Sequence, residues 1–182
     1  MLNCESYVNQ FDPLRDKYGK VCEPADAYAA RMQAGILGHW PTEVLIEWFH
    51  RHAGNLEPYA PLRFERMRFR RETWPNERVP GREAFLDPTF CDNFSDTLNR
   101  AQNRDDWLAV YMATHGTWNT PIVLLESKER ISIGEDLLTR EPLHLLEGHR
   151  RLAFLEALRE RGRAASEHVV WIANLEPLSS AV

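Results

Sequence analysis

The sequence predicts a mixed α+β protein, and the order of its hydrophobic patterns carries this prediction. Apolar runs of strand length occur at residues 121–125, 143–146 and 168–173. Between the last two runs, apolar residues recur every three to four positions, which is typical of an amphipathic helix. Helical patterns also fill much of the N-terminal third. Strands and helices that alternate in this way indicate an α/β or α+β arrangement.

The N-terminal elements are predicted to be helical. The first twenty residues are polar and aperiodic, which indicates an ordered arm or a short helix. A helix is predicted over residues 24–34, because a proline stands at its start and Gly35 follows its end. A second helix is predicted from Pro41 to Gly54. One face of it carries Val44, Leu45, Trp48 and Phe49.

The middle of the chain predicts a strand, a loop and a helix. Residues 62–70 alternate in a way that suits a strand. One side of that strand would carry Phe64, Arg66, Arg68 and Arg70. Residues 74–88 hold three prolines and a glycine, and they predict a loop. Residues 92–114 predict a helix, with Asp105 or Asp106 as a cap within it.

Composition and length narrow the class of protein. A chain of 182 residues is expected to form a single compact domain. Its three cysteines lack CxxC or zinc-ligand spacing, which excludes a disulfide framework and favours a reducing compartment. Apolar runs fall far short of the ~18 residues that a membrane span needs. The N-terminus also lacks a signal-peptide pattern. We therefore expect a cytoplasmic protein with no membrane insertion.

Charge is distributed unevenly along the chain. The net charge is −5, yet arginines cluster at residues 63–71 and 150–163. Local basic patches on an acidic protein can bind phosphates without making the whole molecule bind anions. In the first cluster, Arg66, Arg68 and Arg70 would form an electrostatic track for DNA. The alternative is an exposed edge strand that its charges protect from aggregation.

The candidate site is the turn between the strand at 143–146 and the helix after it, with the sequence Glu147-Gly148-His149-Arg150-Arg151. A helix N-terminus has unpaired backbone N–H groups and about half a positive charge, so it suits an anion. Gly148 lets the backbone turn tightly and approach a ligand closely.

Three potential cations at the positive end of a helix oppose its dipole. An acidic ligand such as a polyphosphate would remove this conflict. The alternative is a solvated first turn in which Arg150 and Arg151 pair with Glu147 and Glu141. The residues alone leave both interpretations open.

The segment LHLLEGHRRLAFLEAL resembles the strand–turn–helix of the ParB/sulfiredoxin-like superfamily. ParB partition proteins carry Gly-Glu-Arg-Arg at this turn, which Gly148, Arg150 and Arg151 match, while His149 replaces the glutamate. Sulfiredoxins carry Gly-Cys-His-Arg, and ParB-like serine kinases carry Asp-Gly-His-His-Arg. The upstream Gly116-Thr117-Trp118-Asn119-Thr120-Pro121-Ile122-Val123 is similar to the superfamily's approach to the preceding strand. The resemblance covers roughly residues 62–175.

This resemblance implies a ParB/sulfiredoxin-like fold over residues 61–182, with residues 1–60 as an N-terminal helical extension packed on the same domain. It implies that the turn binds the phosphates of ATP or another nucleotide. Peroxiredoxin repair is excluded, because Gly148 stands where sulfiredoxins have their nucleophilic cysteine. Small relatives include plasmid fertility-inhibition factors, which inhibit conjugative DNA transfer and are credited with ATPase and DNase activity.

The resemblance also suggests a role for each residue of the turn. The backbone N–H groups of residues 148–150 would hold a phosphate, and Arg150 and Arg151 would bind its oxygens. Glu147 would hold Mg²⁺ or orient a water molecule, and His149 would act as a general acid or base. The leading hypothesis is therefore an NTP hydrolase, a DNA nuclease or both.

The alternative is a non-catalytic, nucleotide-responsive module that docks on a protein partner, such as a conjugation or secretion-system protein. The length of the N-terminal extension favours this alternative. Of the six tryptophans, most are expected in the core, and one or two to stack on a base.

Overall fold

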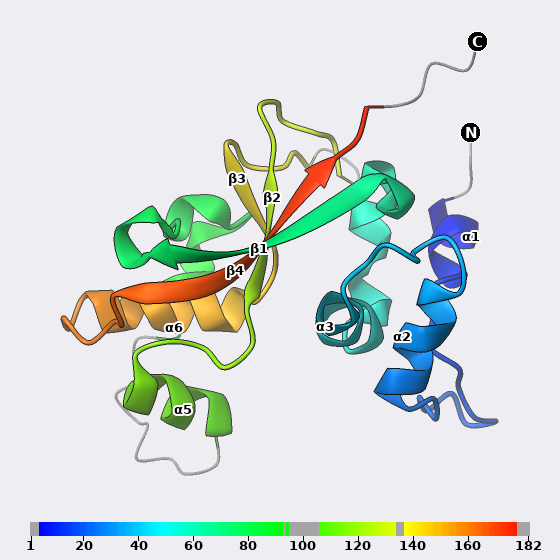
Figure 1. Ribbon diagram of the computed structural model, residues 1–182, viewed down its shortest axis with the longest axis horizontal. Coiled ribbons are helices and arrows are strands. Elements are labelled where there is room, and N and C mark those ends of the chain that lie inside the picture. Colours follow the sequence, from blue (N-terminus) through cyan, green and yellow to red (C-terminus); the bar gives the residue numbers. More distant parts are fainter. Residues whose placement is uncertain (1–3, 93, 95–105, 134–136, 178–182) are drawn as a thin grey trace. The chain divides into compact units, whose positions relative to one another are not determined.

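The computed structural model describes residues 4–92, 94, 106–133 and 137–177 (Figure 1). They form two compact units, and the chain passes between these units more than once. Unit 1 comprises Met1–Phe69, Ile131–Thr139 and Asn174–Val182, and unit 2 comprises Arg70–Arg130 and Arg140–Ala173. The expected division at residue 60 and the expected single domain stay predictions. No described helix is both long enough and apolar enough to cross a membrane.

A four-stranded mixed sheet runs through the described residues, which confirms the α+β class. Its order is β1 (Met67–Pro75), β4 (Glu167–Leu175), β2 (Ile122–Glu126) and β3 (Leu143–Glu147). Strand β2 pairs in parallel with β4 and antiparallel with β3. Strands β1 and β4 run antiparallel, because Asn76 N donates to Ser166 O at one end and Glu176 N donates to Arg66 O at the other.

Unit 2 is built around helix α6 (His149–Arg159), which contacts β2, while α5 (Trp107–His115) contacts α6. The predicted apolar stripe of α6 is buried, with Leu152, Leu155 and Leu158 fully covered. These leucines join the strand residues of unit 2 in one hydrophobic core. Burial of this stripe fixes which side of α6 faces the sheet and where its N-terminus lies.

Unit 1 holds the N-terminal helices around an aromatic core. These helices are α1 (Cys4–Asn9), α2 (Ala25–Gln33) and α3 (Thr42–Val44), which continues as a π-helical segment at Leu45–His50. The ring of Phe64 lies edge-to-face against Phe49 and Phe11, with centroids 4.8 and 5.3 Å apart. The helix predicted over 24–34 is confirmed as α2. The helix predicted from Pro41 to Gly54 begins as expected but is α-helical only to Val44 and π-helical from Leu45 to His50.

The predicted strand at 62–70 is wrong in its first half. Residues Glu57–Leu62 and Phe64–Arg66 form 3-10 turns, and Arg63 between them has a φ of 58°. Phe64 is apolar because it packs into the aromatic core of unit 1, and not because it faces one side of a sheet. This apolar residue made the sequence look like an alternating strand. Strand β1 begins at Met67 and extends into the region predicted as a loop.

Only part of the predicted helix at 92–114 can be compared with the structure, because residues 93 and 95–105 lie outside the described residues. Helix α5 begins at Trp107, and Asp106 caps it by accepting a hydrogen bond from Ala109 N at 3.2 Å. Asp106 is one of the two caps that the sequence predicted. Gly116 ends the helix in the left-handed conformation.

Candidate functional site

The turn after β3 has the predicted order: Glu147 ends the strand, Gly148 makes the turn and His149 begins α6. Gly148 is buried, with φ and ψ of 100° and 27°. A Cβ at this position would lie 2.6 Å from Ile122 Cγ2 and 2.9 Å from Ile122 Cβ. A Cβ atom essentially never approaches a non-bonded heavy atom so closely, so the backbone path after β3 requires glycine.

The N-terminus of α6 has no side-chain cap. The first backbone hydrogen bond of the helix runs from Leu152 N to Gly148 O, at 2.9 Å. In an α-helix the N–H groups before that bond have no partner within the helix, and they carry the positive end of its dipole. The turn therefore places N–H groups and partial positive charge at residues 149–151.

Arg151 is buried beside the turn and forms an ion pair with Glu147. Its Nη2 donates to Glu147 Oε1 at 2.9 Å, and its Nη1 donates to Thr120 O at 3.1 Å. The two side chains of this ion pair are only 9% and 13% exposed. The expected pairing of an arginine with Glu147 is thus confirmed, and Arg151 is held as a fixed charge beneath the turn.

Arg150 points to a different partner from the one that the sequence suggested. It forms an ion pair with Asp106, the cap of α5, and its guanidinium lies 5.7 Å from the centre of the Phe154 ring. The Arg150 side chain is 50% exposed. Pairing with Glu141 was wrong, because the Glu141 carboxylate lies 3.7 Å from Arg130.

His149 lies at the edge of two aromatic rings. Its ring centre is 5.8 Å from that of Phe85 and 5.9 Å from that of Phe90. A second histidine, His144, lies buried in β3. Burial, followed by the nearby charges of His149 and Arg140, lowers the pKa of His144 to about 4. His144 is therefore neutral at pH 7, and His149 is the less buried histidine of the two.

The residues around Gly148 do not form a Mg²⁺ site by themselves. Among the described residues, no three His, Cys, Asp or Glu side chains gather closely enough to hold a metal ion. Glu147 is the only acidic residue within the turn, and one of its oxygens accepts from Arg151. Mg²⁺ usually keeps several waters and is held by one or two carboxylates together with substrate phosphates. Glu147 would be the carboxylate that the turn supplies to such a site, so its metal role stays a prediction.

The three arginines predicted to bind DNA do not share one strand face. Arg66 precedes β1 and donates to Glu176 O at 2.8 and 2.6 Å. Arg68 pairs with the Glu176 carboxylate at 2.6 Å, within unit 1. Arg70, in unit 2, pairs with Glu126 at 2.8 Å and with Glu72 at 2.5 Å. These contacts resemble the charge-protected strand that was the alternative.

A partly buried chain of polar side chains in unit 2 was not predicted from the sequence. His168 Nδ1 contacts Thr117 Oγ1 at 2.8 Å, and its Nε2 contacts Asn76 Oδ1 at 3.1 Å. Arg159 Nε donates to the same Asn76 oxygen at 2.9 Å. Burial and the charge of Arg159 lower the pKa of His168 to about 4. The sequence did not reveal these hydrogen bonds, because their partners lie far apart along the polypeptide. They connect the loop at residues 76–80 to α6 and β4.

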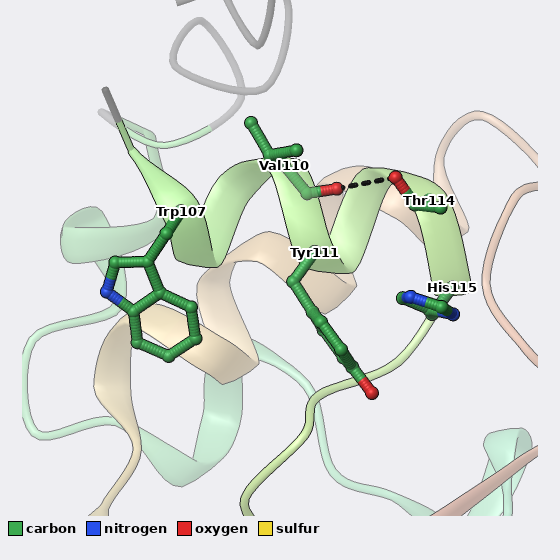
Figure 2. A pocket seen from close by; sticks show the side chains of 5 residues that line it. All are labelled: Trp107, Val110, Tyr111, Thr114 and His115. Atoms are coloured by element: carbon green, nitrogen blue, oxygen red, sulfur yellow. Dashed lines mark hydrogen bonds between the residues drawn. The ribbon is translucent and has the colours of Figure 1, made fainter. Parts of the chain in front are cut away.

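The outer side of α5 was also missed. An open pocket of about 470 Å³ lies along it, lined by Trp107, Val110, Tyr111, Thr114 and His115 (Figure 2). The signal was present in the sequence, because α5 is apolar on all sides and a helix of that kind cannot bury every face at a protein surface.

Comparison of the chain with protein families, with curated proteins and with solved structures found no match. No family membership is therefore established for the chain. The ParB/sulfiredoxin-like assignment stays a prediction that depends on the residues of the turn.

Proposed function

We propose that this protein binds a nucleotide through its phosphate groups at the turn between β3 and α6, as a ParB/sulfiredoxin-like protein would. One observation carries the proposal: Gly148 turns in a conformation that only glycine fits, directly before the uncapped N-terminus of an eleven-residue helix. The glycine lets the chain pass closely over β2 into the helix, and the start of the helix then offers its unpaired backbone N–H groups to an anion.

The two arginines would serve the phosphate differently. Arg151 is held by Glu147 and Thr120, so it would fix the shape of the turn while its charge is balanced by Glu147. Arg150 is half exposed and held at the surface by Asp106. An exposed ion pair contributes only ~0–1 kcal/mol. A multiply charged phosphate can therefore draw Arg150 away from Asp106 at little cost.

Binding fits the geometry better than hydrolysis does. The hydrolase hypothesis requires Glu147 to orient water or hold Mg²⁺, yet its carboxylate is committed to buried Arg151. His149 begins α6 beside the turn and would serve as a general acid or base, so NTP or DNA hydrolysis is the second candidate. Action in conjugative DNA transfer would follow from the likeness to fertility-inhibition factors, with a transfer or secretion protein as the partner of a binding module.

The proposal predicts opposite effects for two substitutions in one ion pair. Arg150→Ala removes a charged donor to the phosphate and is expected to weaken ATP binding about tenfold or more. Asp106→Asn removes the competitor for Arg150 and keeps a side chain that caps α5, so binding is expected to tighten about two- to fivefold. Isothermal titration calorimetry with ATP and CTP, with and without Mg²⁺, measures both effects.

A structural role of the pair gives a different pattern. In that case Arg150→Ala and Asp106→Asn both lower thermal stability slightly and change no affinity. Equal affinity of all three proteins for every nucleotide contradicts the proposal. Turnover of ATP or plasmid DNA that Glu147→Gln abolishes would instead favour the hydrolase.

A further inference from the structure

We infer that the aromatic side of α5 stacks the base of the nucleotide whose phosphates bind at the β3–α6 turn. This inference rests on the proposed function and adds a second contact region to it. The residues concerned are Trp107, Tyr111 and His115, which occur every fourth position along α5. All of them belong to unit 2, as does the turn.

The three rings project from the same side of the helix (Figure 2). Trp107 is 58% exposed, although an indole gains strongly from burial. The rings of Tyr111 and His115 lie 4.3 Å apart, with 36° between their planes. Trp107 stands one turn away, about 6 Å along the helix axis. These residues, with Val110 and Thr114, line an open pocket whose lining is mostly apolar.

The chemistry of this pocket favours a flat aromatic ligand. The hydroxyl of Thr114, one of its polar groups, already donates to Val110 O at 2.8 Å. We expect recognition of the base to come mostly from stacking on Trp107 and Tyr111. Stacking tolerates any base, because every base has a π-face. We thus expect little discrimination between ATP and CTP.

An ion pair connects the helix that carries the pocket to the phosphate turn. Asp106 caps α5, directly before Trp107, and its carboxylate binds Arg150 in the first turn of α6. Arg150, which is proposed to bind phosphate, therefore contacts Asp106, and the next residue in the chain is Trp107, which is proposed to bind the base. A nucleotide matches this arrangement, because it has anionic oxygens at one end and a planar ring at the other.

The test compares ATP with inorganic tripolyphosphate, which carries the phosphates without a base. Calorimetry is performed on the full chain, on Trp107→Ala, on Trp107→Phe and on the control Tyr18→Ala. Tyr18 is an exposed aromatic residue in unit 1, 81% accessible to solvent. We expect Trp107→Ala to weaken ATP binding about five- to 150-fold and to leave tripolyphosphate binding unchanged. Trp107→Phe should retain most of the ATP affinity, and Tyr18→Ala all of it.

Four outcomes overturn the inference. If the unmodified protein binds ATP and tripolyphosphate equally, or if Trp107→Ala binds ATP normally, the base site is wrong and the phosphate turn stands. If the unmodified protein binds neither compound, the base site and the proposed function both fail. A loss of binding to both compounds in Trp107→Ala also overturns it, because the tryptophan would then support the phosphate turn and not the base.

Discussion

Replacing Gly148 with alanine is expected to lower the free energy of unfolding by about 2–5 kcal/mol. Two costs add at this position. A residue with a side chain in the left-handed region loses roughly 1–2 kcal/mol. Overpacking adds typically 1–3 kcal/mol, because the new Cβ would lie 2.6 Å from Ile122 Cγ2 in β2. Denaturant unfolding, followed by tryptophan fluorescence, measures the change.

Gly162→Ala is the matched control, since it isolates the first of these costs. Gly162 has a φ of 63°, but a Cβ there would meet no atom within 4 Å. It should therefore lose only the left-handed penalty of roughly 1–2 kcal/mol. If Gly148→Ala is no more destabilising than Gly162→Ala, the close approach of the turn to β2 is wrong.

Lowering the pH is expected to destabilise the fold at pH values above those at which the carboxylates take up protons. His144 and His168 both have a pKa lowered from 6.5 to about 4, chiefly by burial. The unfolded chain therefore binds these protons more readily than the folded chain does. Stability is full above pH 6.5 and falls as the pH drops from 6.5 towards 4. By pH 4.5 the loss should reach about 2–3 kcal/mol for each histidine.

Unfolding free energies at pH 7, 5.5 and 4.5 test this expectation. His144→Leu and His168→Asn serve as controls for each other, because each variant should keep about half of the pH dependence. The carboxylates respond mainly at lower pH. A hydrogen bond from Arg31 lowers the pKa of Glu23, and one from Trp74 lowers that of Glu72. Equal stability at pH 7 and pH 4.5 would show that neither histidine is buried in its neutral form.

The secondary structure was predicted best from the sequence where the local hydrophobic pattern agrees with the burial of the residues. The apolar runs at 121–125, 143–146 and 168–173 are strands β2, β3 and β4, because a continuous apolar run of that length suits a strand buried in a sheet. The stripe that begins after Arg151 buries one side of α6. Local chemistry also placed the turn at Gly148, since few other residues allow a strand to pass so abruptly into a helix.

Prediction failed where tertiary contacts decide the outcome. Phe64 belongs to an aromatic core that it shares with Phe11 and Phe49, and no local pattern reveals that core. The partner of Arg150 is Asp106, 44 positions earlier in the chain, whereas the sequence suggested only nearby acids. Likewise, the exposure of Trp107 depends on which side of α5 meets α6. Pairings of this kind follow from the fold and not from spacing.

The central claim is that phosphate groups bind at the turn between β3 and α6. A titration of ¹⁵N-labelled protein with ATP, followed by two-dimensional ¹H–¹⁵N NMR, tests it most directly. The account predicts that the backbone amides of Gly148, His149 and Arg150 shift most and saturate together. It is contradicted if those three amides stay in place while ATP binds, or if the largest shifts fall on residues 66–70 of the arginine-rich segment.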